Sequence, residues 1–267
     1  SYPTLSAFSG VLCMLSIRSC VVVLSLMTLS TFASAQTPAP TPEREHLETR
    51  LMARLKLAAE YYGQGQLGQA LRELNGAQDI ASDYAPLQSL LGIVNMDLNR
   101  HDEAEKAFQK ALRLDRDNPD IHNNYGWFLF VFGNASKGIE WLTKAYTNPL
   151  YTTPEKALYN AGKCARKGGD TAMATEYFSK ALLVAPRSSA VVYEMASMQF
   201  DAGDYDKTLE LLDRFHSMDQ ETPQSLWLAL RSEQRLGHTM EVESYAKKLQ
   251  RKFPDSAETT LWVNRTL

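Results

Sequence analysis

The amino-acid sequence predicts an all-α fold, a right-handed superhelical solenoid of about six repeated helix pairs. Three observations lead to this prediction. A pattern of small residues returns about every 34 residues along the chain. Large apolar residues, such as Phe108 and Phe178, fall between these small residues, and prolines stand where helices are expected to end, as Pro186 does.

The repeat is clearest in four consecutive segments. In each segment a small residue is followed twelve and then nineteen positions later by two others: Ala58, Ala70 and Ala77; Gly92, Ala104 and Ala111; Gly126, Gly138 and Ala145; Gly162, Ala174 and Ala181. This spacing resembles that of the tetratricopeptide repeat, in which antiparallel helices approach closely at these positions. A larger side chain there would push the helix backbones apart.

Continuing this phase in both directions divides most of the chain into repeats. We expect these at residues 51–84, 85–118, 119–154, 155–188, 189–222 and 223–256, with residues 257–267 as a C-terminal tail or capping helix. The last two repeats carry larger residues at the packing positions. Terminal repeats are commonly atypical, so we expect wider helix packing there.

One repeat is longer than the others. The additional residues lie in the segment 148–154, which contains Pro149 and Pro154 and therefore breaks the helix. We predict a hinge or a surface loop at this point. The sequence leaves open whether it is a tolerated insertion or a contact site.

The N-terminal region has the pattern of a secretory signal peptide over residues 1–35, with Met14 as the better start. Arg18 lies in a short positive region, an apolar run follows, and Ala33-Ser34-Ala35 forms a small-residue cleavage site. The alternative is an uncleaved membrane anchor, but the run is shorter than the roughly 20 residues needed to span a bilayer. Residues 36–50 are predicted to be a flexible leader.

The composition argues against several classes of function. The full chain has a formal net charge of −3, and loss of Arg18 with the signal peptide makes the exported part slightly more acidic. Binding of nucleic acid through phosphates requires concentrated Lys and Arg, so we expect none. The sequence also has no recognisable catalytic or metal-binding motif, so we expect no enzyme activity, no cofactor and no metal.

After cleavage, Cys164 would be the one remaining cysteine. It lies two residues after Gly162 on the first helix of the fourth repeat, where a small apolar side chain suits helix packing. We interpret it as a structural residue; a reactive thiol would need activating neighbours placed by the fold.

The first helices of the repeats are expected to line the concave face of the solenoid, where such proteins bind their partners. Helical phase predicts an apolar partner-binding groove in the first three repeats, formed by Leu55, Tyr62, Ile93, Met96, Asn123, Trp127 and Phe130. In the fourth repeat the same face becomes basic, and we predict a secondary patch of Lys156, Lys163, Arg166 and Lys167.

The alternative for the two aromatic residues Trp127 and Phe130 is that they belong to the core. Against this, Tyr125, Gly126 and Leu129 already occupy the positions predicted to be buried. Exposed aromatic groups rimmed by charge generally mark partner sites. We therefore assign both aromatic residues to the groove.

Four segments resemble a specific family, the type IV pilus biogenesis and stability proteins PilF and PilW: Asn123 to Leu129, Leu150-Tyr151, Glu194-Met195-Ala196 and Leu249 to Pro254. The resemblance covers about residues 51–256. It implies a six-repeat pilotin, a non-enzymatic factor that helps the outer-membrane secretin of the pilus reach its place and form its multimeric ring. It also implies that the first repeats hold this protein partner in their groove.

The sequence departs from this family at its N-terminus. Family members are typically lipoproteins with a lipidated cysteine, but neither Cys13 nor Cys20 follows a credible lipobox. We therefore expect an exported periplasmic protein that associates with the outer membrane indirectly, through its partner. We also expect a monomer. The alternative function is a general exported scaffold for envelope protein complexes, for which the basic patch would matter more than the apolar groove.

Overall fold

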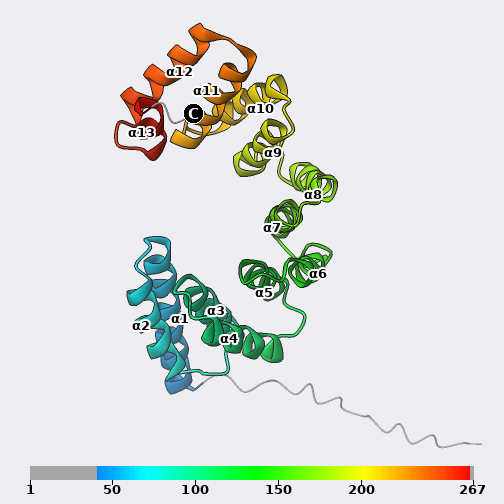
Figure 1. Ribbon diagram of the computed structural model, residues 1–267. Helices are drawn as coiled ribbons and strands as arrows, with labels where there is room; N and C mark the ends of the chain where they lie inside the picture. Colours follow the sequence, from blue (N-terminus) through cyan, green and yellow to red (C-terminus); the bar gives the residue numbers. More distant parts are fainter. Residues whose placement is uncertain (1–40, 265–267) are drawn as a thin grey trace, which may run out of the picture. The chain divides into compact units, whose positions relative to one another are not determined.

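The computed structural model describes residues 41–264, which form thirteen α-helices and contain no strand (Figure 1). The helices are α1 (Pro42–Gly63), α2 (Leu67–Gln78), α3 (Ala85–Asp97), α4 (His101–Leu114), α5 (Pro119–Val131), α6 (Ala135–Tyr146), α7 (Pro154–Lys167), α8 (Thr171–Val184), α9 (Ser189–Asp201), α10 (Tyr205–Met218), α11 (Pro223–Leu236), α12 (Thr239–Lys252) and α13 (Ala257–Val263).

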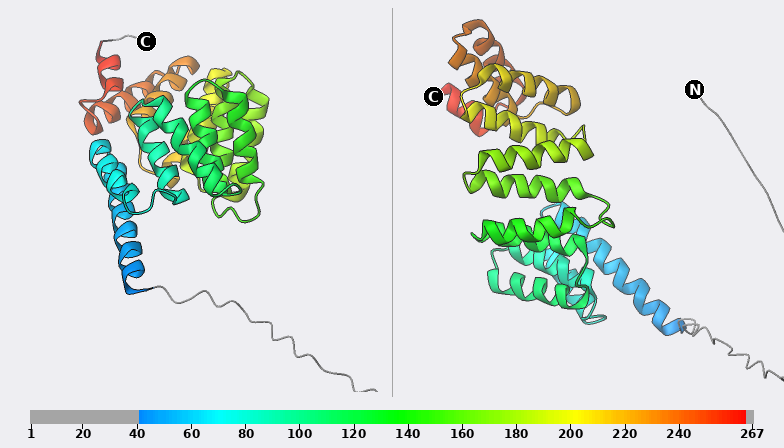
Figure 2. Two further views of the ribbon diagram at one scale, coloured as in Figure 1. Left: turned by 90° about the horizontal axis from the view of Figure 1, so that it is seen from below. Right: turned by 90° about the vertical axis from the view of Figure 1, so that its right-hand side faces the viewer.

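The first twelve helices form six consecutive pairs. Each odd-numbered helix packs against the even-numbered helix that follows it, and each even-numbered helix also packs against the next odd-numbered one. Figure 2 shows the pairs stacked in sequence order, and Figure 1 shows α5, α7 and α9 on the inner side of the curved stack with α6, α8 and α10 outside. The predicted all-helical solenoid of tetratricopeptide repeats is confirmed.

Local sequence signals determine where the first helix of each repeat begins. Pro119 is the first residue of α5, where a missing N–H costs nothing, and the Asn118 side chain accepts hydrogen bonds from the N–H groups of Asp120 and Ile121 at 3.0 and 3.2 Å. The helices α3, α5, α7, α9 and α11 all begin within one residue of the repeat starts predicted from the sequence.

The first repeat differs from the prediction. Helix α1 begins at Pro42, so residues 42–50, predicted as part of a flexible leader, are helical. Thr41 caps this helix, and a proline stands in its first turn. The negative charges of Glu43 and Glu45 stabilise the helix by interacting with the positive end of its dipole. These residues are all exposed, and Figure 2 shows the start of α1 extending beyond the stacked helices. Part of the predicted leader is therefore helical, and the packing pattern of the repeats did not predict this helix.

The turn inside each repeat uses a left-handed backbone conformation. A residue with positive φ follows the first helix of every pair, where it lets the chain reverse direction. Asn99, at a φ of 57°, takes this role in the second repeat, and Asn is the side chain besides Gly that tolerates it best. In the other repeats the residue is Gly65, Gly133, Gly169, Gly203 or Gly237.

The small residues of the repeat allow close helix packing. A Cβ atom on Gly162 would lie 2.5 Å from the ring of Phe178, which is fully buried. In the third repeat the contact is between two backbones, because a Cβ on Gly126 would lie 2.9 Å from the carbonyl oxygen of Gly138. Since a backbone oxygen cannot rotate away, α5 and α6 require glycine at this point.

We expect Gly126→Ala to lower the free energy of unfolding by about 1–3 kcal/mol, the usual cost of overpacking. Gly63→Ala is the matched control, because a Cβ there would meet no atom within 4 Å other than those of its own helix backbone and chain neighbours. Urea unfolding followed by circular dichroism measures both. Equal unfolding midpoints for the two variants would show that α5 and α6 do not approach as closely as described.

The long turn between α6 and α7 is anchored at both ends. Asn148 donates a hydrogen bond to the carbonyl of Asp117 at 3.1 Å and accepts one from the N–H of Leu150 at 2.9 Å. Tyr151 is buried in the core cluster that includes Ala157, whereas the Leu150 side chain is 81% exposed. The segment is a surface loop held in place by Tyr151, and its exposed apolar tip is Leu150.

The predicted signal peptide, residues 1–35, and residues 36–40 of the predicted leader lie outside the described residues. Helix α13 forms within the predicted C-terminal tail and packs against α11 and α12. Of the helices in residues 41–264, none is long and apolar enough to cross a bilayer. In the same part of the chain no group of three or more His, Cys, Asp or Glu side chains is placed to hold a metal ion.

Candidate functional site

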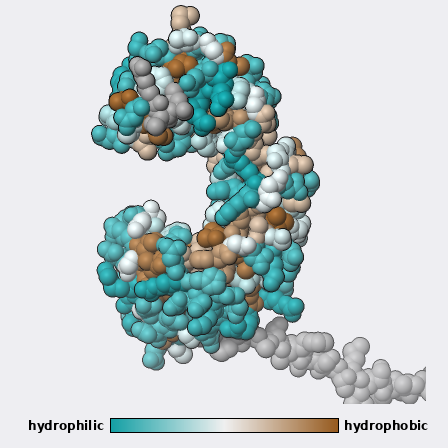
Figure 3. Space-filling model, viewed as in Figure 1, coloured by the Kyte–Doolittle hydropathy of each residue, from teal (hydrophilic) through white to brown (hydrophobic). Residues whose placement is uncertain are grey.

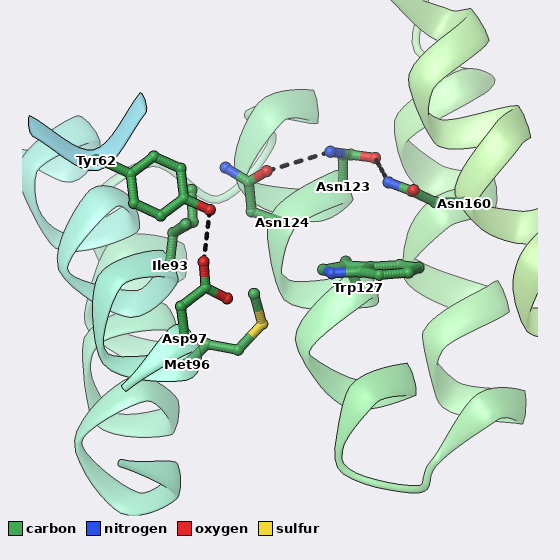
Figure 4. Close-up of a pocket in the computed structure, with 8 residues that line it drawn as sticks. All are labelled: Tyr62, Ile93, Met96, Asp97, Asn123, Asn124, Trp127 and Asn160. Carbon is green, nitrogen blue, oxygen red and sulfur yellow. Dashed lines mark hydrogen bonds between the residues drawn. The ribbon is translucent and has the colours of Figure 1, made fainter. Parts of the chain in front are cut away.

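A pocket of about 420 Å³ lies on the inner face of the first four repeats. Its walls come from α1, α3, α5 and α7, and we call it the groove: Tyr62, Ile93, Met96, Asp97, Asn123, Asn124, Trp127 and Asn160 (Figure 4). Figure 3 shows apolar surface along the inner side of this half of the molecule, in contrast to its hydrophilic outer side.

The floor of the groove is apolar. Trp127 and Ile93 are half-buried, and Met96 is buried beside them. The Trp127 ring packs between two core clusters and lies 4.9 Å from the ring of Phe130, so its orientation is fixed. A rigid aromatic side chain that keeps one part exposed in a pocket is the usual form of a binding anchor.

At the α1 side of the groove, the hydroxyl of Tyr62 donates a hydrogen bond to Asp97 Oδ2 at 2.7 Å. Burial, this hydrogen bond and the negative charge of Asp97 together raise the pKa of Tyr62 to about 12. The hydroxyl therefore remains a donor at neutral pH. It fixes the Asp97 carboxylate at the edge of the groove and joins the first repeat to the second.

A chain of polar side chains crosses the groove from α7 to α3. Asn160 Nδ2 donates to Asn123 Oδ1 at 3.0 Å, and Asn123 Nδ2 donates to Asn124 Oδ1 at 3.2 Å. Asn124 Nδ2 then donates to the hydroxyl of Ser89 at 3.1 Å. Figure 4 shows the three amides above the Trp127 ring. We call Asn123, Asn124 and Asn160 the amide row.

A second pocket of about 350 Å³ continues the inner face toward α9 and is lined by Phe130, Lys163, Arg166, Lys167 and Glu194. The Arg166 guanidinium donates to Glu194 at 2.7 Å, to Asp201 at 2.6 Å and to Ser197 at 2.8 Å. Its charge is therefore compensated within the protein.

The other two cations of this pocket contact aromatic rings. Lys163 Nζ lies 5.0 Å from the centroid of the Trp127 ring, and Lys167 Nζ lies 5.0 Å from that of Phe130. Neither lysine forms an ion pair within residues 41–264. We call Lys163 and Lys167 the lysine pair.

The structure brings most of the predicted groove residues together and places two of them elsewhere. Tyr62, Ile93, Met96, Asn123 and Trp127 line the groove. Leu55 does not line it: its side chain is half-buried against the core cluster that joins the first and second repeats. It lies two helical turns before Tyr62 on α1, about 10 Å away along the helix axis.

Phe130 is a core residue, contrary to the prediction that it is an exposed anchor. Its side chain is only 7% exposed and belongs to the cluster that includes Ala157 and Ala161. The cluster also contains residues of α6 and α8, so the Phe130 ring is enclosed between the third and fourth repeats. Leu129, predicted to be buried, is half-buried instead and lines a different pocket with Trp141.

The predicted basic patch is partly assembled. Lys163, Arg166 and Lys167 lie around the second pocket, whereas Lys156 is exposed near the start of α7 and lines neither pocket. Because Arg166 is compensated by two carboxylates, the lysine pair supplies the uncompensated positive charge at the second pocket.

Sequence reasoning missed three groove residues, Asp97, Asn124 and Asn160. Asn124 and Asp97 each directly follow a predicted groove residue in the chain, and one step along a helix turns the side chain by about 100°. They therefore flank the predicted stripe. Asn124 and Asn160 occupy the same position of successive repeats, and that recurrence was the available signal.

Cys164 is fully buried on α7. Burial raises the pKa of its thiol to about 12, so the thiolate does not form at neutral pH. The structure thus agrees with a structural role in helix packing.

Comparison with known proteins supports the repeat assignment. Two family models described as tetratricopeptide repeat match residues 89–151 and 155–188. These segments cover most of the second and third repeats and the whole of the fourth repeat. They contain most of the residues that line the two pockets.

Relatives are similar over almost the whole chain. The type IV pilus assembly protein PilF of Pseudomonas aeruginosa is 25% identical over 244 residues, which cover 91% of this chain and 97% of PilF. The crystal structure of PilW, a widely conserved type IV pilus biogenesis factor, has a TM-score of 0.73 at 25% identity and covers 80% of this chain and 98% of PilW. The solved structure of Pseudomonas aeruginosa PilF has a TM-score of 0.68 at 25% identity, with 82% and 99% covered. Repeat phase, helix order and these comparisons agree that the chain is a tetratricopeptide repeat protein, similar over most of its length to the type IV pilus proteins PilF and PilW.

Proposed function

We propose that the protein is a non-enzymatic assembly factor for type IV pili that binds the outer-membrane secretin subunit and promotes its localisation and multimerisation. The names of its relatives, an assembly protein and a biogenesis factor, support a role in pilus assembly. The tetratricopeptide fold supports a role in protein–protein interaction. The secretin is the partner that the sequence resemblance implies.

One observation carries the proposal most directly, the groove on the inner face of the first four repeats. It combines an apolar floor around Trp127 with polar groups at its rim, a combination that generally marks a partner site. The half-exposed Trp127 ring can be desolvated by an apolar side chain of the partner. Since Trp127 is already held in place, little conformational entropy is lost on binding.

Binding in the groove explains how the protein would act on the secretin. A monomer that has yet to enter a ring exposes apolar surface that its neighbours will later cover, and such surface favours aggregation. Occupying the groove covers part of this surface. Contacts between subunits then replace the contacts with the groove when the ring forms.

We further propose that the protein works in the periplasm, next to the outer membrane, without a lipid of its own. This follows from the predicted cleavage after Ala35 and from the lack of a lipobox at Cys13 and Cys20. Mass spectrometry of the mature N-terminus is expected to show an unmodified chain that begins at Gln36. A diacylated cysteine at the N-terminus would contradict this part of the proposal.

The proposed function is tested by deleting the gene and measuring the secretin in separated inner and outer membranes. We expect heat-stable secretin multimers to be lost from the outer membrane and to return when the intact gene is restored. Total secretin is measured in the same samples, so that a change in synthesis is recognised. Normal multimers in the deletion strain would overturn the proposal.

A further inference from the structure

The amide row provides groups that fit the backbone of an extended peptide. Each Asn side chain can form four hydrogen bonds through two N–H donors and two lone pairs. Asn123 uses one donor and one acceptor within the row, toward Asn124 and Asn160. The remaining groups suit the N–H and C=O groups of an extended chain, which have no partners of their own and need them when buried.

The two sides of the groove carry opposite charges. At the α3 side, the Asp97 carboxylate accepts a hydrogen bond from the hydroxyl of Tyr62, which is a neutral donor. Within residues 41–264 this is the one side-chain hydrogen bond of Asp97. At the α7 side, the lysine pair contacts aromatic rings and forms no ion pair within residues 41–264, and the Glu194 carboxylate that lines the same pocket is paired with Arg166. Both charges are therefore available to a ligand.

The groove does not end at the lysine pair. Lys163 contacts the Trp127 ring of the groove and also lines the second pocket, together with Phe130. Because the two pockets meet at these residues, a bound chain can continue beyond the lysine pair toward α9. This arrangement fits an internal segment of a partner better than a chain end.

From these observations we propose that the groove binds an internal, extended peptide segment in which an apolar side chain lies between an acidic and a basic one. The apolar side chain covers Trp127 and Ile93, and the acidic side chain meets the lysine pair. The basic side chain meets Asp97, and the amide row bonds the backbone. This inference deepens the proposed function, on which it rests, by giving the chemistry of the segment that the groove would take from the secretin.

Selection from a library of short random peptides, displayed on phage and free of any secretin sequence, tests this inference on the immobilised full chain. We expect the selected peptides to be enriched in Asp or Glu near an apolar residue. Wild-type selections without such enrichment would overturn the inference.

A charge reversal then tests the lysine pair. The double variant Lys163→Glu, Lys167→Glu is expected to bind a selected peptide about tenfold more weakly. Its affinity should recover when the acidic residue of the peptide is replaced by Lys. Lys156→Glu is the matched control on the same helix, outside both pockets, and should bind as the wild type does. A loss of affinity that the charge-swapped peptide does not restore would overturn the inference. Thermal melting checks that each variant is folded. If the double glutamate variant is not folded, the double variant Lys163→Gln, Lys167→Gln is used in its place.

A last arm separates an internal acidic side chain from a C-terminal carboxylate. Selected peptides are synthesised with an amidated and with a free C-terminus, and equal affinity is the expected result. Binding that requires the free C-terminus would overturn the inference. These experiments contain no secretin, so the two proposals can fail separately. Normal secretin multimers in the deletion strain would overturn the proposed function alone. Selected peptides without enrichment of Asp or Glu would overturn the inferred peptide chemistry alone.

Discussion

Replacing Phe130 with alanine is expected to lower the free energy of unfolding by about 3–5 kcal/mol, the usual cost of removing a buried aromatic ring. The Phe130 side chain is 7% exposed and packs in the cluster that joins the third and fourth repeats. Truncation would leave a cavity between α5 and α7. Urea unfolding followed by circular dichroism measures the change.

Val131→Ala provides the control for this experiment. Val131 is the next residue on α5, but its side chain is 40% exposed, so its truncation is expected to cost no more than about 0.5 kcal/mol. If the two variants unfold at the same urea concentration, Phe130 is not a core residue, and the earlier expectation that it is an exposed anchor of the groove is restored.

The second large effect is expected for Trp127→Ala, which should weaken binding of the purified secretin subunit by about 30-fold, or about 2 kcal/mol. The Trp127 ring forms the centre of the groove floor, and its removal leaves the partner's apolar side chain without a surface to cover. Isothermal titration gives the dissociation constants. The unfolding midpoint is measured alongside, because Trp127 also packs against two core clusters.

Trp227→Ala is the matched control for this measurement. Trp227 is another half-buried tryptophan, on α11 in the sixth repeat, where it packs near Leu230 and lines neither the groove nor the second pocket. Its truncation is expected to leave secretin binding unchanged. Equal affinities for the two variants would remove Trp127 from the binding site.

The repeat period was sufficient to predict the fold because close helix packing restricts which residues are allowed. Gly126 and Gly138 must be small since the α5 and α6 backbones meet there. Such constraints recur once per repeat and are visible in the sequence. The start of α1 carries no such constraint: residues 42–50 are exposed and helical, held by the Thr41 cap and local propensity. Packing periodicity therefore gave no sign of them.

The candidate site could be predicted only in part, because it depends on how deeply each side chain is covered by the next repeat. Trp127 and Phe130 lie on the same face of α5, yet Phe130 is buried in the core cluster that joins the third and fourth repeats, whereas Trp127 stays half-exposed. Similarly, Arg166 appeared to be a free cation until the structure showed it bound to Glu194 and Asp201. These pairings join different repeats, and helical phase within one repeat does not predict them.

We propose that this protein promotes secretin assembly by binding the secretin subunit in the groove. This claim is tested most directly by restoring the deletion strain with Trp127→Ala or with Trp227→Ala, at equal protein levels, and measuring heat-stable secretin multimers in the outer membrane. We predict that Trp227→Ala restores the multimers and that Trp127→Ala does not. Full restoration by Trp127→Ala would contradict the claim.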